Sequence, residues 1–281
     1  MKNIKKRSRS LRREPLKVEE LQTRYRLLPE VVEILELVQQ VSGKDIDFRP
    51  VRKLNVAATT KVARQRMPQH IISFDRGKAD RINYIIAHEC GHILRMLQLP
   101  PADRLVPATT SATVSIAAEV LADEVTFLPP ALIPRMLDVW VGGLVLQVTN
   151  QPVDVKIEQW LYSNYPGLRR EQVQGLEKDA RVALKALAIE VERMAPPTVF
   201  RISNAMNYAY LNHINKITGR NYRNRFRGRQ EIIGLGKQLY EISEGEWSDV
   251  EVANQWAEHL GIRQWFSWIG FEDMPESYYR D

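Results

Sequence analysis

Cysteine and long apolar runs are the two features this sequence most clearly lacks. Cys90 is the only cysteine among 281 residues, so an internal disulfide framework is excluded and a reducing compartment is favoured. The most apolar run, 140–148, is too short to span a bilayer. The basic N-terminus is followed by no apolar segment of the kind a secretory signal requires. We therefore expect a cytoplasmic protein with no membrane partner.

The composition is that of a soluble globular protein. Hydrophobic residues make up 44% of the chain and charged residues 26%. The length allows one large domain or two modest ones, with a sizeable core. A net charge of +6 is basic but not extreme, so charge alone does not identify a partner.

The strongest chemical signal is the motif His88-Glu89-Cys90-Gly91-His92. Isoleucine, leucine and methionine recur at helical spacing around it, which predicts that the motif lies on a helix. Two histidines four residues apart share a helix face, so both imidazoles can bind one zinc ion, with Glu89 beside the position left for water. We predict His88 and His92 as metal ligands and Glu89 as the catalytic base. Gly91 is costly inside a helix, but is useful if another element must approach the backbone closely.

A catalytic zinc site has three protein ligands, so one more must come from elsewhere. The stretch 115–125 is predicted to be a second helix, with small residues on it that permit close helix packing. Glu119 and Asp123 lie four residues apart and share a face. Glu119 is the predicted third ligand, and Asp123 is predicted to accept a hydrogen bond from the far nitrogen of a ligating histidine. Three rival ligands remain open: Glu124, Asp103 and His70.

Together these motifs resemble the ImmA/IrrE-type metallopeptidases, which are small intracellular gluzincins. The residues that carry the resemblance are His88-Glu89-x-x-His92, then Glu119-x-x-Ala122-Asp123, then Leu128-Pro129-Pro130. Cys90-Gly91 departs mildly, because the family often has a leucine and a glycine there. The resemblance implies proteolysis of a specific partner, such as a transcriptional repressor or a stress or defence regulator. A SprT-like zincin would instead use a third histidine, and the next one in the chain is His213.

The leading interpretation is thus a cytoplasmic zinc-dependent endopeptidase. The alternative is a non-catalytic regulator that keeps zinc for structure and binds nucleic acid or protein. Glu89 favours the enzyme, since a purely structural site would give it no task. A peptidase also needs a donor to the oxyanion. The candidates for that donor are His213, Tyr208 and Tyr210.

The pattern around the motif predicts an α+β, zincin-like catalytic unit. An amphipathic helix is expected at 18–41 and strands at 45–51, 54–62 and 69–74, forming a small antiparallel sheet packed on the metal-binding helices. The strand 69–74 leads into the motif helix, so its free edge is expected to pair with an extended substrate. The connection 101–114 is either a lid or a simple linker.

Three regions are predicted along the chain. Residues 1–14 form a basic, disordered arm, 15–150 a zinc metallopeptidase domain, and 151–281 a mostly helical region that selects substrate or senses a signal. Gln151-Pro152 marks the predicted boundary. The aromatic residues near the C-terminus are expected to pack back onto the body.

A basic cluster in the last region is interleaved with Tyr222 and Phe226. Arginines mixed with aromatic side chains suit nucleic acid, through phosphate pairing and base stacking, and equally suit an acidic protein partner. The residues of this cluster are Lys216, Arg220, Arg223, Arg225, Arg227 and Arg229.

Overall fold

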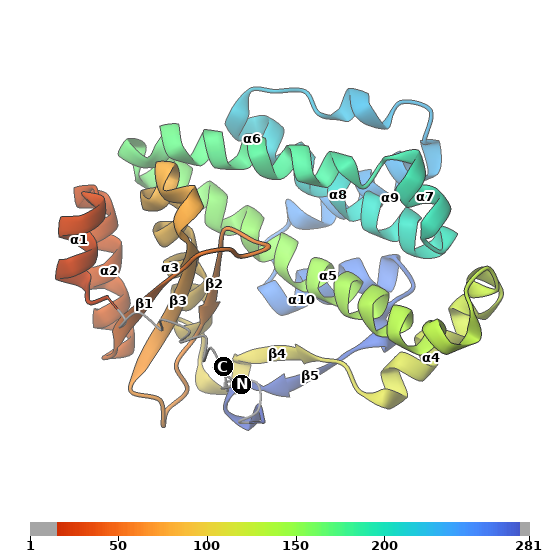
Figure 1. The fold of residues 1–281 in the computed structure, drawn as a ribbon, viewed down its shortest axis with the longest axis horizontal. Helices are drawn as coiled ribbons and strands as arrows, with labels where there is room; N and C mark the ends of the chain where they lie inside the picture. The colour runs from red at the N-terminus through yellow and green to blue at the C-terminus, as the bar shows by residue number, and fades with distance from the viewer. Residues whose placement is uncertain (1–15, 276–281) are drawn as a thin grey trace, which may run out of the picture.

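The computed structural model describes residues 16–275 and has an α+β architecture (Figure 1). Helices dominate, and two small sheets lie on one side of the molecule. This confirms the predicted α+β class. The predicted disordered arm, residues 1–14, lies outside the described residues.

The first predicted helix is two helices, α1 (Val18–Tyr25) and α2 (Pro29–Ser42). Arg26 adopts a left-handed conformation at the end of α1, and a proline at the first position of α2 disfavours helical geometry in the residue before it. The N–H of Leu28 donates to Asn83 Oδ1 at 2.8 Å, which ties the break to the start of the motif helix. Local chemistry therefore interrupts an otherwise continuous apolar pattern.

The three-stranded sheet is mixed and not antiparallel as predicted. Its strands are β1 (Asp45–Val51), β2 (Ala58–Lys61) and β3 (Gln69–Asp75). Their order is β1-β3-β2, with β3 parallel to β1 and antiparallel to β2. The residues after β1 cross to the other side of β3, and the Leu54 N–H donates to the Asp75 carboxylate. β2 therefore pairs with β3 and forms no hairpin with β1. The central strand β3 has no free edge, and β2 is an edge strand.

The motif helix is α3 (Ile82–Leu97), and the second predicted metal helix is α4 (Ser111–Leu121). Between them, β4 (Leu105–Ala108) pairs with β5 (Ser267–Gly270) near the C-terminus. This pairing ties down the connection that was predicted to be a lid or a linker. Trp265 is buried beside β5, as expected for an aromatic end that packs onto the body.

Helix α5 (Ile133–Asn164) runs straight through the predicted domain boundary at Gln151-Pro152. A proline inside a helix loses one hydrogen bond and costs about 3 kcal/mol. Tertiary packing outweighs this cost, because Val148 before the proline and Ile157 after it are fully buried in two different apolar clusters. Helix α5 therefore continues without a break across the predicted boundary.

The rest of the chain wraps α5 with helices (Figure 1). α5 contacts α3, α4, α6, α8 and α10. Among the described residues, the segment Pro130–Asn164 is the one helical stretch long and apolar enough to cross a membrane, a test that the core helix of a soluble protein also passes. The remaining helices are α6 (Arg169–Lys185), α7 (Ile189–Met194), α8 (Pro197–Thr218), α9 (Gln230–Ser243) and α10 (Asp249–His259).

Candidate metal centre

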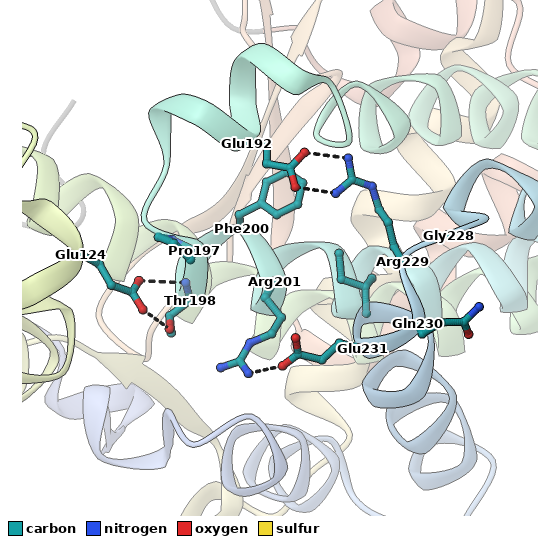
Figure 2. Close-up of a pocket in the computed structure, with 11 residues that line it drawn as sticks. Glu124, Glu192, Pro197, Thr198, Phe200, Arg201, Gly228, Arg229, Gln230 and Glu231 are labelled. Carbon is teal, nitrogen blue, oxygen red and sulfur yellow. Dashed lines mark hydrogen bonds and ion pairs between the residues drawn. The ribbon is translucent and has the colours of Figure 1, made fainter.

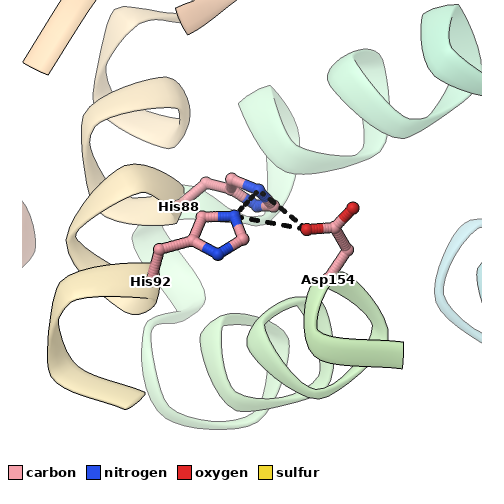
Figure 3. Close-up of side chains that lie close together, drawn as sticks. All are labelled: His88, His92 and Asp154. Atoms are coloured by element: carbon pink, nitrogen blue, oxygen red, sulfur yellow. Dashed lines mark hydrogen bonds and ion pairs between the residues drawn. The ribbon is translucent and has the colours of Figure 1, made fainter. Parts of the chain in front are cut away.

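The two motif histidines lie on one face of α3, and Asp154 from α5 points at both of them (Figure 3). His92 Nε2 lies 3.2 Å from His88 Nε2. Asp154 Oδ1 lies 3.2 Å from His92 Nε2 and 3.6 Å from His88 Nε2. Three electron-pair donors therefore converge on one point in space.

This spacing fits a metal ion. Zinc ligands at about 2.0–2.1 Å in a tetrahedron lie about 3.3 Å from one another. The three separations, 3.2, 3.2 and 3.6 Å, straddle that value. Three lone pairs this close repel unless a positive charge lies between them, and either a shared proton or a metal ion provides that charge. The residues present therefore suit a divalent ion, and the cluster could hold one.

Hydrogen bonds among these side chains set the charge of each one. Burial raises the pKa of Asp154, but hydrogen bonds from His88 and His92 outweigh burial and hold that pKa below its usual range. Burial lowers the pKa of His88, yet hydrogen bonds to Asp154 and Glu158 raise it well above the ordinary value. Asp154 is thus ionised, and a metal ion that bound here would displace the proton that His88 holds. The three side chains keep 19–25% of their surface exposed, so a small molecule can reach them.

Glu158 lies one helical turn beyond Asp154 and orients His88. Its Oε1 lies 2.7 Å from His88 Nδ1 and also accepts a hydrogen bond from the Tyr84 hydroxyl at 2.7 Å. Gln172 donates to its Oε2, also at 2.7 Å. A carboxylate on Nδ1 leaves the Nε2 lone pair free for a metal and increases its basicity. Glu158 therefore has the role that the sequence assigned to Asp123.

Close packing of α6 against α3 positions this hydrogen-bond network. A Cβ atom on Gly175 would lie 2.3 Å from Tyr84 Cε1, so only glycine allows α6 to come this near. Gln172 lies three residues before Gly175 and is fully buried. Because Gly175 has no side chain, α6 packs close enough to α3 for the Gln172 amide to reach Glu158.

Glu89 is held by the edge strand of the sheet. The Thr60 hydroxyl on β2 donates to Glu89 Oε2 at 2.6 Å, and Glu89 is only 9% exposed. The carboxylate is therefore nearly buried with one fixed partner. Within residues 16–275, no hydrogen bond reaches its second oxygen, which leaves one side of the carboxylate available for a proton.

The structure does not bring the predicted third ligand to the imidazoles. Glu119 is exposed on α4, and Asp123 is exposed in the 3₁₀ segment after it, Ala122–Val125. Figure 1 places α4 at the opposite side of the molecule from α3. Asp154 therefore replaces Glu119 in the cluster, as a correction to the sequence-based assignment.

The three rival ligands also lie outside the cluster of His88, His92 and Asp154. Glu124 accepts hydrogen bonds from the N–H and the hydroxyl of Thr198, at 2.8 and 2.7 Å, beside a cavity of about 590 Å³ (Figure 2). His70 is fully buried on β3 and accepts from the Ala63 N–H at 2.9 Å. Asp103 is exposed in the connection after α3. The remaining charged side chains of the Figure 2 cavity are paired, as Arg229–Glu192 and Arg201–Glu231.

Of the three candidate oxyanion donors, Tyr210 is the one within electrostatic reach of the cluster. Burial raises its pKa well above the usual value, and the charges of Asp179, Asp154 and Glu158 add to that rise. His213 is buried beside Tyr240 with a ring separation of 4.5 Å. Tyr208 packs against Phe226. Among the described residues, no hydrogen bond or ion pair joins His213 or Tyr208 to His88, His92 or Asp154.

Asp154 and Glu158 were missed by the sequence analysis, although a pattern for them existed. They are carboxylates four residues apart in the region predicted to be mostly helical, the same spacing that singled out Glu119 and Asp123. Their place behind Gln151-Pro152 assigned them to another domain. The continuity of α5 through the proline is what brings them to α3.

Comparison of the chain with protein-family models, with curated proteins and with solved structures finds no match.

Proposed function

We propose that this protein is a zinc-dependent peptidase whose metal is held by His88, His92 and Asp154. The observation that carries the proposal is the near-tetrahedral spacing of the three ligand atoms, 3.2–3.6 Å apart, on a helix that also presents Glu89. Three ligands leave the fourth position open, as catalytic zinc sites do. A closed structural site would need a fourth protein ligand.

The donor set favours zinc over magnesium and calcium. Two imidazoles and one carboxylate oxygen suit zinc, whereas magnesium and calcium prefer all-oxygen ligands. No thiolate takes part, because Cys90 is fully buried on α3 and burial raises its pKa. When bound, zinc would supply Lewis-acid activation of a water molecule and of the substrate carbonyl.

Glu89 would perform the proton transfers. The Thr60 hydroxyl holds one carboxylate oxygen, which fixes the orientation of the other. The free oxygen would accept a proton from the attacking water and then give it to the leaving amine. Glu158 would keep the His88 ring in place through Nδ1 during these steps. A structural zinc site needs no proton acceptor, so the presence of Glu89 favours a catalytic site.

The edge strand β2 favours a peptide as the substrate. Thr60 lies on this strand, so an extended chain that pairs with the outer edge of β2 would pass beside Glu89. This moves the predicted docking edge from β3 to β2. The ImmA/IrrE-type resemblance further suggests a specific regulator as substrate, although only its histidine motif, and not Glu119-x-x-Ala122-Asp123, lies at the site.

Glu89→Gln tests the proposal. The variant is expected to bind one zinc per chain like the wild type and to lose activity by a factor of about 10²–10⁴ in a peptide-library cleavage assay read by mass spectrometry. Glu119→Gln is the matched control, because it neutralises an exposed carboxylate on α4 and should leave both readouts unchanged. Cleavage that persists in Glu89→Gln, or its absence in the zinc-loaded wild type, would overturn the proposal.

A further inference from the structure

The loop 219–229 between α8 and α9 carries five arginines and no acidic residue. The loop is folded and anchored. Phe226 is fully buried, with its ring 5.1 Å from that of Tyr208, and the Tyr222 N–H donates to Asn215 Oδ1 at 3.0 Å. Gly219 and Gly228 adopt φ values of +67° and +88°, which L side chains rarely take. The arginines are thus presented on a defined surface.

A basic cavity of about 700 Å³ lies on one side of this loop. No acidic side chain is among the described residues that line it. Tyr222 contributes a half-buried ring to the wall, and the loop faces the end of α6 across the cavity. The charged residues of the lining are Arg181, Lys185, Arg225 and Arg229.

A second cavity, of about 630 Å³, lies on the other side of the loop. Asn221 lines both cavities, so the two are adjacent. The one acidic side chain that lines the second cavity, among the described residues, is Glu241. Its basic residues are Lys216, Arg220, Arg223 and Lys237.

The cations in these cavities outnumber their acidic partners. Three of them form ion pairs: Arg229 with Glu192, Arg220 with Glu177 and Lys216 with Glu244. The other five have no ion-pair partner within residues 16–275, so their charge faces solvent or a ligand. These five are Arg181, Lys185, Arg223, Arg225 and Lys237.

We propose that these two cavities form a single-stranded nucleic-acid site that is separate from the metal centre. Exposed guanidinium groups pair with phosphates in a planar, two-point geometry. Tyr222 offers a ring on which a base can stack. Two cavities that meet at Asn221 suit a polymer that continues from one to the next, and each is large enough for a nucleotide.

Fluorescence anisotropy with a labelled oligothymidylate and the full-length protein tests this inference. The double variant Arg223→Gln/Arg225→Gln removes two exposed, unpaired charges and is expected to weaken binding at least tenfold. The slope of log K against log salt should fall by about 1.4, because each phosphate contact on a single strand contributes about 0.7. Thermal unfolding is expected to be unchanged, since both side chains are exposed.

Matched controls separate the surface from net charge. Arg52→Gln/Lys53→Gln removes the same charge from an exposed site after β1 and should leave binding within twofold of the wild type. Tyr222→Leu should weaken binding about fivefold or more, whereas Tyr222→Phe keeps the ring and the affinity. Glu89→Gln should bind the oligonucleotide normally, so this inference and the peptidase proposal fail or succeed separately.

Three outcomes would overturn the inference. The first is an equal loss of affinity in the Arg52/Lys53 control. The second is tighter binding of a duplex, or of poly-glutamate, than of the single strand. The third is no detectable binding by the wild type at low salt, where phosphate contacts are strongest.

Discussion

Gly91 and Ile157 are in such close contact that any side chain at position 91 would force its neighbours to shift. A Cβ atom there would lie 2.7 Å from Ile157 Cγ2 and 3.1 Å from Cγ1. Gly91 lies within the histidine motif on α3, and Ile157 lies between Asp154 and Glu158 on α5. The glycine therefore lets the helix that bears the carboxylates come close enough to meet the imidazoles. This close packing offsets the loss of helix propensity that a glycine causes.

Gly91→Ala should accordingly destabilise the protein and weaken metal binding. Overpacking costs about 1–3 kcal/mol, which exceeds the roughly 1 kcal/mol that alanine adds to a helix. Gly143→Ala is the matched control, because this glycine is exposed within α5 with nothing near its Cβ position. Urea unfolding and zinc titration should show losses for the first variant and a small gain in stability for the second. Equal behaviour of the two variants would contradict the packing argument.

Asp154→Ala should reduce zinc affinity by roughly a hundredfold or more, since loss of a direct ligand exceeds the effect of losing an outer partner. Glu119→Ala should retain full affinity, because its side chain is exposed on α4. Metal content by mass spectrometry and competition with a chelator measure both. The reverse result would restore the ligand set predicted from the sequence.

Glu158→Gln should reduce zinc affinity about 10–100-fold without removing a ligand. A glutamine oxygen could still accept from His88 Nδ1 and Tyr84, but the side chain would lose its negative charge and turn an NH₂ group towards the Gln172 donor. Tyr84→Phe removes only one of these contacts and should have a smaller effect. Wild-type affinity in Glu158→Gln would mean that the carboxylate does not tune the histidine.

Asp249→Asn should destabilise the protein by about 1–3 kcal/mol. Its carboxylate accepts from Arg95 on α3 at 2.6 and 2.9 Å and from Lys156 on α5 at 3.0 Å. Loss of its charge leaves two partly buried cations facing each other. Asp80→Asn breaks the exposed pair with Lys178 and should cost less than about 0.5 kcal/mol. Chemical denaturation compares the two, and similar losses would argue against a special role for Asp249.

His70 should make the fold sensitive to acid. Burial, helped by the charge of Lys44, lowers its pKa to about 4, against 6.5 unperturbed. The unfolded chain therefore binds a proton first, and stability falls as the pH drops below 6.5 towards 4. Between pH 7 and pH 5 this group alone should cost about 2 kcal/mol. In chelator-treated protein, His70→Asn should show a loss smaller by this amount; an identical pH profile would contradict the assignment.

Several elements followed from the sequence because their causes are local. The strand Asp45–Val51 was predicted with its observed ends, and the motif helix was predicted from its apolar spacing and the prolines after it. Histidines four residues apart must share a helix face whatever surrounds them. The basic loop was likewise visible as a run of arginines. Each of these features depends on neighbours within a turn or two of the chain.

The errors arose where distant segments decide the outcome. The mixed sheet depends on a crossover after β1, and no local pattern distinguishes that crossover from a hairpin. Pro152 looked like a boundary, but burial on both sides of it carries the helix through. The same reasoning about carboxylate spacing that selected Glu119 and Asp123 applied equally to Asp154 and Glu158.

The sequence by itself therefore determined the α+β class, the helix that carries His88 and His92, and the glycine that makes room beside them. Only the tertiary structure decided which carboxylate completes the cluster. The reason is physical: a metal site needs atoms within a few ångströms of one another, and that distance depends on how two helices pack. Spacing along the chain limits which residues can share a helix face. The contact of Gly91 with Ile157 decides which face of α5 lies against the histidines of α3.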